Sequence, residues 1–113
     1  MARDLEEVVE LARKFREERD WAQFHSPKDL AISVAIEAGE LLETFQWSGA
    51  DTENVSRRDQ TEQELADVLI YCLYLADALG VSAADIIERK LKADAEKYPV
   101  ERARGTARKY TKL

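Results

Sequence analysis

Apolar residues recur every three or four positions in four segments of the chain, and this spacing predicts four amphipathic α-helices. The first segment starts at Asp4, which suits a helix cap, and runs to about Asp20. The second starts at Ser26 and Pro27, a capping serine followed by a proline in the first turn, and runs to about Phe45. No segment alternates apolar and polar residues as a strand does, so the pattern predicts an all-α protein.

A loop is predicted between the second and third helices, over residues 46–56, where glycine, aspartate and asparagine gather. Ser56 or Asp59 then opens the third helix. Gly80 closes that helix, because glycine readily adopts the left-handed conformation in which many helices end.

The fourth helix is predicted from Ser82 to Tyr98, because Ser82 can cap its first turn and Pro99 stops it. Residues 100–113 then form a basic C-terminal tail. With 113 residues the chain is expected to form one domain, 1–113. Four helices with short links favour a four-helix bundle with up-and-down order, or a close relative of it.

The second predicted helix has two apolar stripes with acidic residues between them. On a helical wheel, Glu37 and Glu40 fall in the strip that separates the stripes. The main stripe consists of Leu30, Val34, Ala38, Leu41 and Phe45, and the second of Ile32 and Ile36. Carboxylates flanked by apolar surface are expected to be partly buried, and burying like charges together is costly without a cation.

The third predicted helix repeats this design. Its main stripe consists of Val68, Cys72, Leu75 and Leu79, its second stripe of Ala66, Ile70 and Leu73, and the strip between them of Glu64, Asp67, Tyr71 and Tyr74. Cys72 is therefore expected in the core. Two apolar faces on each helix exceed what a small monomer needs, which predicts a homo-oligomer.

Two acidic pairs, Glu37 with Glu40 and Glu64 with Asp67, carry the candidate chemistry. Residues three apart lie on one face of a helix, so each pair presents two carboxylates side by side. Two such helices facing each other would make a cage of four carboxylates. That set of hard oxygen ligands suits Mg²⁺ or Mn²⁺, and magnesium usually binds together with a phosphorylated substrate. A single pair of this kind is usually a solvated helix face, whereas two pairs bordered by apolar stripes favour a metal site.

The net charge of −6 is distributed unevenly along the chain. The first 88 residues carry 8 Lys/Arg and 20 Asp/Glu, a net charge of −12, whereas residues 89–113 carry 9 and 3, a net charge of +6. The acidic body repels nucleic acid, so general DNA or RNA binding is not expected. A short basic segment beside a carboxylate-bound metal is suited to holding a compact polyphosphate.

A cytoplasmic protein without a membrane partner is expected. The apolar runs are far shorter than the roughly 20 residues of a membrane span. Residues 1–7 lack the apolar core of a secretion signal, and the single Cys72 cannot form an internal disulfide.

Five segments of the sequence resemble a known family. They are Arg19–His25, Ile36–Leu41, Phe45–Trp47, Glu64–Tyr71 and Lys97–Gly105. In this order and at this spacing they resemble the MazG-like all-α nucleoside triphosphate pyrophosphohydrolases, most closely the dCTP pyrophosphatase branch. The resemblance covers about residues 5–110. It is specific because the motifs occur together, whereas an isolated pair of glutamates would not be.

The resemblance implies hydrolysis of a (deoxy)nucleoside triphosphate to the monophosphate and diphosphate, with Mg²⁺ required. It assigns metal binding to Glu37, Glu40, Glu64 and Asp67, and base and sugar binding to Trp21, Gln23, Phe24, His25, Trp47 and Tyr71. Glu40 or Glu37 is expected to orient the attacking water. Lys90 and Lys97 are expected to contact the leaving phosphates, with Arg102 or Arg104 as further candidates. Active sites of this family lie near subunit interfaces in dimers or tetramers.

Two positions depart from the family pattern. Larger MazG proteins often carry an extra glutamate where Ile36 stands here. Relatives commonly have asparagine at the position of Asp94, which we include among the substrate-binding residues. An acid there could bind metal or repel phosphate.

Several alternatives stay open at this point. His25 is the only histidine and serves either packing or substrate contact, and Phe24 serves either the core or base stacking. The enzyme is expected to take dCTP or modified pyrimidine triphosphates in nucleotide-pool housekeeping. A dUTP/dUDP or phosphoribosyl-ATP hydrolase on the same scaffold is an alternative, as is a non-catalytic helical oligomer whose acidic strips confer solubility.

Overall fold

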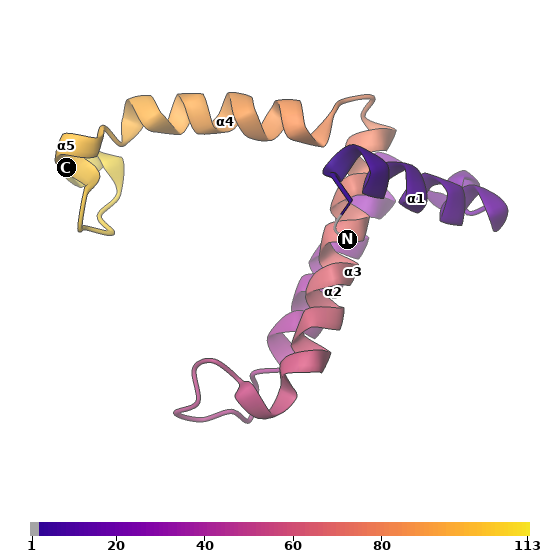
Figure 1. The fold of residues 1–113 in the computed structure, drawn as a ribbon, viewed down its shortest axis with the longest axis horizontal. Helices are drawn as coiled ribbons and strands as arrows, with labels where there is room; N and C mark the ends of the chain where they lie inside the picture. The colour runs from indigo at the N-terminus through magenta and orange to yellow at the C-terminus, as the bar shows by residue number, and fades with distance from the viewer. Residues whose placement is uncertain (1–2) are drawn as a thin grey trace. The chain divides into compact units, whose positions relative to one another are not determined.

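The structure is a computed structural model that describes residues 3–113, and it is helical, as Figure 1 shows. Its helices are α1 (Leu5–Glu18), α2 (Pro27–Glu43), α3 (Arg58–Ala78), α4 (Ala83–Lys97) and α5 (Val100–Ala103), with 3-10 helices at Ala22–Phe24, Val55–Arg57 and Tyr110–Lys112. No strand occurs within the described residues, so the prediction of an all-α protein is confirmed.

Side chains cap three of the helices at the positions that the sequence predicts. Asp4, Ser26 and Ser82 each accept a hydrogen bond from the backbone amide three residues later, at 2.9, 3.1 and 3.2 Å. Pro27 occupies the first turn of α2, where a missing N–H costs nothing. Each such cap stabilises its helix by about 1 kcal/mol.

The start of α3 differs from the prediction. Neither Ser56 nor Asp59 caps it, because the 3-10 turn Val55–Arg57 leads directly into the helix and Arg57 occupies the capping position, where its side chain does not cap the helix. The end of α3 is as predicted. Gly80 has φ +71°, and its amide donates to the carbonyl of Asp77 at 3.0 Å.

The chain divides into two compact units, residues 1–80 and 81–113. In the first unit α2 and α3 lie side by side and run in opposite directions (Figure 1). The hydroxyl of Thr61 donates to that of Thr44 at one end of the pair, 3.1 Å apart. At the other end the rings of His25 and Tyr74 lie 5.3 Å apart. Leu30, near the start of α2, has no exposed surface.

Helix α1 is fixed to the C-terminal half of α3 by polar contacts. The hydroxyl of Tyr74 donates to the carbonyl of Ala12 at 2.7 Å. The carboxylate of Asp77 accepts from Arg13 at 2.9 Å and from the buried Arg16 at 2.8 Å. Burial by itself would raise the pKa of Asp77, but the hydrogen bonds from Arg16 and Arg13 outweigh it and hold this pKa below its usual range.

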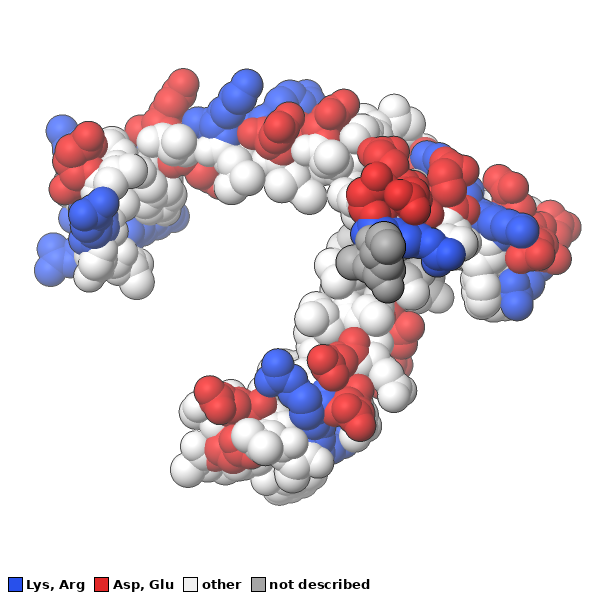
Figure 2. Space-filling view, in the orientation of Figure 1, with Lys and Arg blue, Asp and Glu red and all other residues white. Residues whose placement is uncertain are grey.

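Little apolar surface is buried within one chain. Only Leu30, Tyr74 and Ala76 are buried apolar residues among those described, while many large apolar side chains are exposed, including Ile36 at 56%. Figure 2 shows uncharged surface interrupted by acidic patches along α2 and α3. The predicted second stripe of α2, Ile32 and Ile36, is among this exposed surface.

The prediction that Cys72 lies in the core is wrong, because Cys72 is exposed. Leu79, from the same predicted stripe, is also exposed. The reason is the rotation of α3, which turns the strip of Glu64, Tyr71 and Tyr74 inward against its neighbours instead. The helical wheel identified the stripes of α3, but it could not show which stripe is buried within one chain.

The second unit consists of α4 and the basic C-terminal residues. The predicted tail 100–113 contains α5 and the 3-10 turn Tyr110–Lys112. The rings of Tyr98 and Tyr110 lie 5.9 Å apart, and the ammonium of Lys97 lies 4.9 Å from the centroid of the Tyr110 ring. These contacts pack the end of the chain against the end of α4.

No single helix within residues 3–113 is long and apolar enough to cross a membrane. In the described part of the chain, one bent pair of helices, Val55–Ala78 with Ala83–Lys97, has the necessary length and composition when taken together, and core helices of soluble proteins meet the same criterion.

Candidate active site

Three of the four predicted carboxylates meet between α2 and α3. Glu37 and Glu40 come from α2 and Glu64 from α3, and one carboxylate oxygen from each lies within 4.8 Å of the others. The spacing of three residues places Glu37 and Glu40 one above the other on the face that meets α3. We call these three residues the acidic cluster.

The electrostatics of the acidic cluster are those of a site that needs a cation. Burial raises the pKa of Glu37, and the hydrogen bond and negative charge of Glu40 raise it further. Burial also raises the pKa of Glu64, again with a contribution from Glu40. The Oε2 atoms of Glu37 and Glu64 are buried and have no hydrogen-bond partner among the described residues. Orphaned buried oxygens of this kind are costly unless a ligand completes them.

The residues fit a hard divalent cation. Mg²⁺ takes oxygen ligands at about 2.0–2.1 Å, so oxygens within 4.8 Å of one another need only small side-chain adjustments to bind one ion. Asp67, the fourth predicted ligand, lies outside this group of three. Its charge nevertheless contributes to the raised pKa values of Glu37 and Glu64, which places it beside the cluster.

An aromatic hollow of about 390 Å³ lies between α1, α3 and the turn that follows α1. Its lining includes Trp21, His25, Asp67, Tyr71, Phe15 and Tyr74. Three predicted base-binding residues, Trp21, His25 and Tyr71, thus share one cavity. Asp67 connects this cavity to the acidic cluster.

The imidazole of His25 lies against aromatic rings. Its ring centroid lies 6.4 Å from that of Tyr71 and 5.3 Å from that of Tyr74. Burial lowers the pKa of His25, and the positive charge of Arg16 lowers it further. Its Nδ1 atom is buried without a hydrogen-bond partner among the described residues. A neutral imidazole with an unused polar atom is therefore available to a ligand in the hollow.

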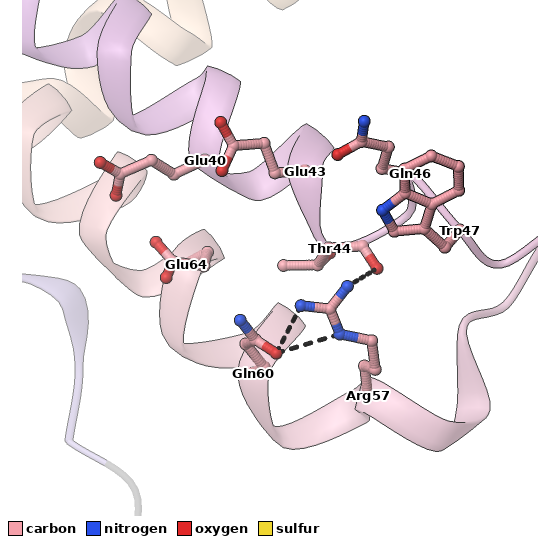
Figure 3. A pocket seen from close by; sticks show the side chains of 8 residues that line it. All are labelled: Glu40, Glu43, Thr44, Gln46, Trp47, Arg57, Gln60 and Glu64. Carbon is pink, nitrogen blue, oxygen red and sulfur yellow. Dashed lines mark hydrogen bonds between the residues drawn. The ribbon is translucent and has the colours of Figure 1, made fainter.

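A second hollow of about 380 Å³ lies beyond the acidic cluster, toward the loop that joins α2 to α3. Figure 3 shows Glu40, Glu43 and Glu64 on one side of it and Arg57 and Trp47 toward the loop. Trp47 is 84% exposed. Within one chain Trp47 lines this second hollow and Trp21 lines the aromatic hollow, although both are predicted to contact the base.

Two other predicted substrate-binding residues do not line either hollow within the described structure. The side chain of Gln23 donates to the carbonyl and carboxylate of Asp20 at 3.0 and 2.9 Å, which stabilises the turn after α1. Phe24 is largely exposed, so it does not lie in the core of one chain. The role of both residues in substrate binding stays a prediction.

The remaining predicted residues belong to the second unit. On α4 the ammonium of Lys90 donates to the carboxylate of Asp94 at 2.9 Å, and Lys97 lies against Tyr110. Asp94, which departs from the family pattern, thus forms an ion pair with Lys90 one helical turn away. The participation of Lys90, Asp94 and Lys97 in the site stays a prediction.

Several residues that line the hollows were not predicted from the sequence as site residues. Tyr74 lies one turn beyond Tyr71 on the strip that carries the acids, and this position could have identified it. Arg57 lies in a segment that the sequence marked only as the boundary between a loop and a helix. No periodicity in the sequence places an arginine at such a boundary.

Comparison with known proteins decides the family. The MazG-like family matches residues 32–113, a range that contains the acidic cluster and Asp67. The chain belongs to the MazG-like family. The dCTP pyrophosphatase 1 of Mus musculus is 40% identical over 115 residues, covering 96% of this chain and 67% of the mouse protein. That of Homo sapiens is 38% identical over 114 residues, with 96% and 67% covered.

A solved structure supports the same assignment. The crystal structure of a pyrophosphatase from Archaeoglobus fulgidus is 41% identical and has a TM-score of 0.76, covering 88% of this chain and 95% of that one. The predicted family resemblance is confirmed. The predicted enzyme class, a nucleoside triphosphate pyrophosphatase of the MazG-like family, is confirmed with it.

Proposed function

We propose that this MazG-like enzyme hydrolyses dCTP or a modified pyrimidine deoxynucleoside triphosphate to the monophosphate and diphosphate, and that it requires Mg²⁺. The observation that carries the proposal is the acidic cluster, with three carboxylate oxygens within 4.8 Å of one another beside a hollow lined by aromatic residues. The preference for dCTP is drawn from the names of relatives that are 38–40% identical. The role that we propose for such a reaction is nucleotide-pool housekeeping, in the cytoplasm.

Glu37, Glu40, Glu64 and Asp67 would hold the metal, with Mn²⁺ as a possible substitute. When bound, such a cation neutralises the charge of a triphosphate and favours departure of diphosphate. The unpartnered oxygens of Glu37 and Glu64 support this assignment, because a cation would supply the partner that each lacks. Asp67 would join the set from the adjoining turn of α3.

The aromatic hollow would take the base and the sugar. Stacking of a base on an aromatic side chain contributes about 1–3 kcal/mol in single-strand binding, and the hollow offers Trp21, His25 and Tyr71. His25 would contact the nucleoside through its unused Nδ1 atom. Asp67, at the boundary of the hollow, would then face the α-phosphate.

Glu40 or Glu37 would orient the attacking water. The water oxygen forms a bond to the α-phosphorus while the bond from that phosphorus to the oxygen bridging the α- and β-phosphates breaks. The proton leaves toward a carboxylate, and diphosphate departs with the bridging oxygen. A pair of glutamates one turn apart allows one to bind the cation while the other holds the water.

We further propose that the enzyme is a homo-oligomer, a dimer or a tetramer, with the active site near a subunit interface. The support is the exposed apolar face of α2 and α3, including Ile32, Ile36 and Leu69, which is larger than a single chain needs. A second copy covering this face would complete the bundle of helices. Light scattering coupled to size-exclusion chromatography measures the mass directly, and a monomer at micromolar concentration would refute this part.

The first experiment is diphosphate release from a panel of NTPs and dNTPs, with Mg²⁺ and with EDTA. The expected result is metal-dependent release from dCTP and few other dNTPs. Release from dUTP with phosphate from dUDP, or turnover of phosphoribosyl-ATP, would assign one of the alternative substrates. No turnover by folded protein with Mg²⁺ present would refute these substrates and indicate another phosphoanhydride substrate or a binding role.

A further inference from the structure

We propose that Arg57 binds the β- and γ-phosphates of the substrate and the diphosphate product, in the hollow beyond the acidic cluster. The inference rests on the proposed function, since it concerns the same site. It places a phosphate-binding arginine in the first unit, in addition to the predicted phosphate-binding residues Lys90 and Lys97 of α4. Arg57 lines the same hollow as Glu40 and Glu64, two of the three members of the acidic cluster (Figure 3).

The guanidinium of Arg57 is held in place by neutral acceptors. Its Nε and Nη2 atoms donate to the side-chain oxygen of Gln60 at 3.1 and 2.8 Å, and its Nη1 atom donates to the carbonyl of Thr44 at 3.1 Å. None of these contacts pairs the positive charge of Arg57 with a carboxylate. A guanidinium has five N–H donors, so three contacts leave two for a further ligand.

The loop between α2 and α3 is also closed by a residue other than Arg57. Asn54, which is buried and has φ +53°, donates to the same Thr44 carbonyl at 2.7 Å and to the hydroxyl of Thr61 at 3.0 Å. The Thr61 hydroxyl in turn donates to that of Thr44. Asn54 and Arg57 thus share the Thr44 carbonyl, and a neutral donor is sufficient for that contact, so the contact does not account for the positive charge of Arg57.

The position of Arg57 relative to the acids matches a polyphosphate. Asp67, Glu64, Gln60 and Arg57 follow one another at intervals of three or four residues, so they lie along one side of α3 and the turn before it. About 10 Å of helix axis separates residues 57 and 64. A substrate with its base in the aromatic hollow and its α-phosphate at the acidic cluster would direct its outer phosphates toward Arg57.

The chemistry of the hollow selects for a phosphate bound with a cation. Three carboxylates, Glu40, Glu43 and Glu64, line the hollow with Arg57, so a bare anion would be repelled there. A diphosphate bound to Mg²⁺ would instead be attracted, because its cation would meet the carboxylates of the acidic cluster. The fork of a guanidinium fits two phosphate oxygens at once, which a lysine ammonium does not.

The test is isothermal titration calorimetry with inorganic diphosphate in excess Mg²⁺, on the full chain. Wild type should bind, and R57Q should bind about ten-fold to a hundred-fold more weakly, because a charge-assisted contact is lost. R57K, which keeps the charge without the fork, should fall between them. N54A serves as the matched control, since it loosens the loop and should lower the melting temperature with little effect on the diphosphate Kd.

A second variant keeps the inference testable if R57Q does not fold. Q60E converts the neutral partner of Arg57 into a carboxylate, so it should keep or raise the melting temperature while weakening diphosphate binding. Q63E adds the same charge at an exposed position of α3 outside the hollow, and should leave binding unchanged.

Three outcomes would overturn the inference: no binding to wild type, equal binding to wild type and R57Q, or equal weakening by N54A and R57Q. The inference and the proposed function fail separately. Binding of diphosphate that depends on Arg57, without turnover of any triphosphate, would reject the proposed hydrolysis and keep the phosphate site. Turnover of dCTP with unchanged diphosphate affinity in R57Q would keep the proposed hydrolysis and reject the phosphate site at Arg57.

Discussion

Two groups of acids in the first unit are placed in opposite ways. Asp77 is bridged by Arg13 and the buried Arg16, so its carboxylate has two opposite charges within 2.9 Å. In the acidic cluster, Glu37 and Glu64 face other carboxylates, and each has a buried oxygen without a partner. The pKa of Asp77 is accordingly lowered, while the pKa values of Glu37 and Glu64 are raised.

This difference separates acids that hold the fold from acids that await a ligand. The Asp77 bridge fixes α1 against α3 and thereby shapes the aromatic hollow. The acidic cluster, without a cation, opposes the fold, because like charges are held together and one oxygen each of Glu37 and Glu64 is buried. The two groups should therefore respond oppositely to neutralisation of one carboxylate.

The largest expected effect is on activity. E64Q should lower kcat/KM by about a hundred-fold or more, because a ligand of the metal is lost, while raising the melting temperature in EDTA through relief of repulsion in the cluster. Steady-state diphosphate release and thermal unfolding measure the two effects. E62Q is the matched control, since Glu62 is exposed on the same helix and lies outside the cluster. Near-normal turnover by E64Q at saturating Mg²⁺ would refute the assigned role.

The next effect is on stability and has the opposite sign. D77N should lower the free energy of unfolding by about 2–3 kcal/mol, because Arg16 is left buried without its carboxylate. Denaturant unfolding of wild type and variant measures the difference. Because the folded pKa of Asp77 is lowered, its contribution is present above the unfolded pKa of about 3.9 and is lost as the pH falls through the folded value. An equal stability of D77N and wild type at neutral pH would remove the distinction between the two groups.

Sequence reasoning predicted the contacts that depend on spacing along one helix. The caps at Ser26 and Ser82 and the pairing of Glu37 with Glu40 follow from local geometry, which the sequence determines. The exposure of Cys72 and the place of Arg57 do not follow from it. They depend on how far α3 rotates about its axis against α2 and on the path of the loop, and long-range packing sets both.

The acidic cluster also predicts how Mg²⁺ and pH act together. Because the folded pKa values of Glu37 and Glu64 are raised, the metal-free protein is destabilised above those values and the penalty is relieved as the pH falls toward the unfolded pKa of about 4.3. Protons also compete with the cation for the carboxylates. The rise in melting temperature on adding Mg²⁺ should thus be largest at about pH 8 and shrink toward about pH 5.

Thermal unfolding across this pH range, with Mg²⁺ and with EDTA, measures that dependence. E64Q should reduce the Mg²⁺ effect at every pH, whereas E62Q should retain the wild-type behaviour. A stabilisation by Mg²⁺ that does not change with pH would mean that the cation binds elsewhere on the acidic surface.

The smallest effect concerns Gly39, which lies between the two glutamates of α2. A Cβ added there would meet nothing within 4 Å in the chain, so G39A should stabilise the metal-free protein by about 1 kcal/mol, the difference in helix propensity between the two residues. Urea unfolding measures it, and A38G, the reverse change at the exposed neighbour, should destabilise by a similar amount. A stabilised G39A with normal turnover would show that the space stays open during catalysis. Lower turnover with raised stability would show that substrate or a second copy of the chain fills it, and a loss of stability would contradict the predicted gain.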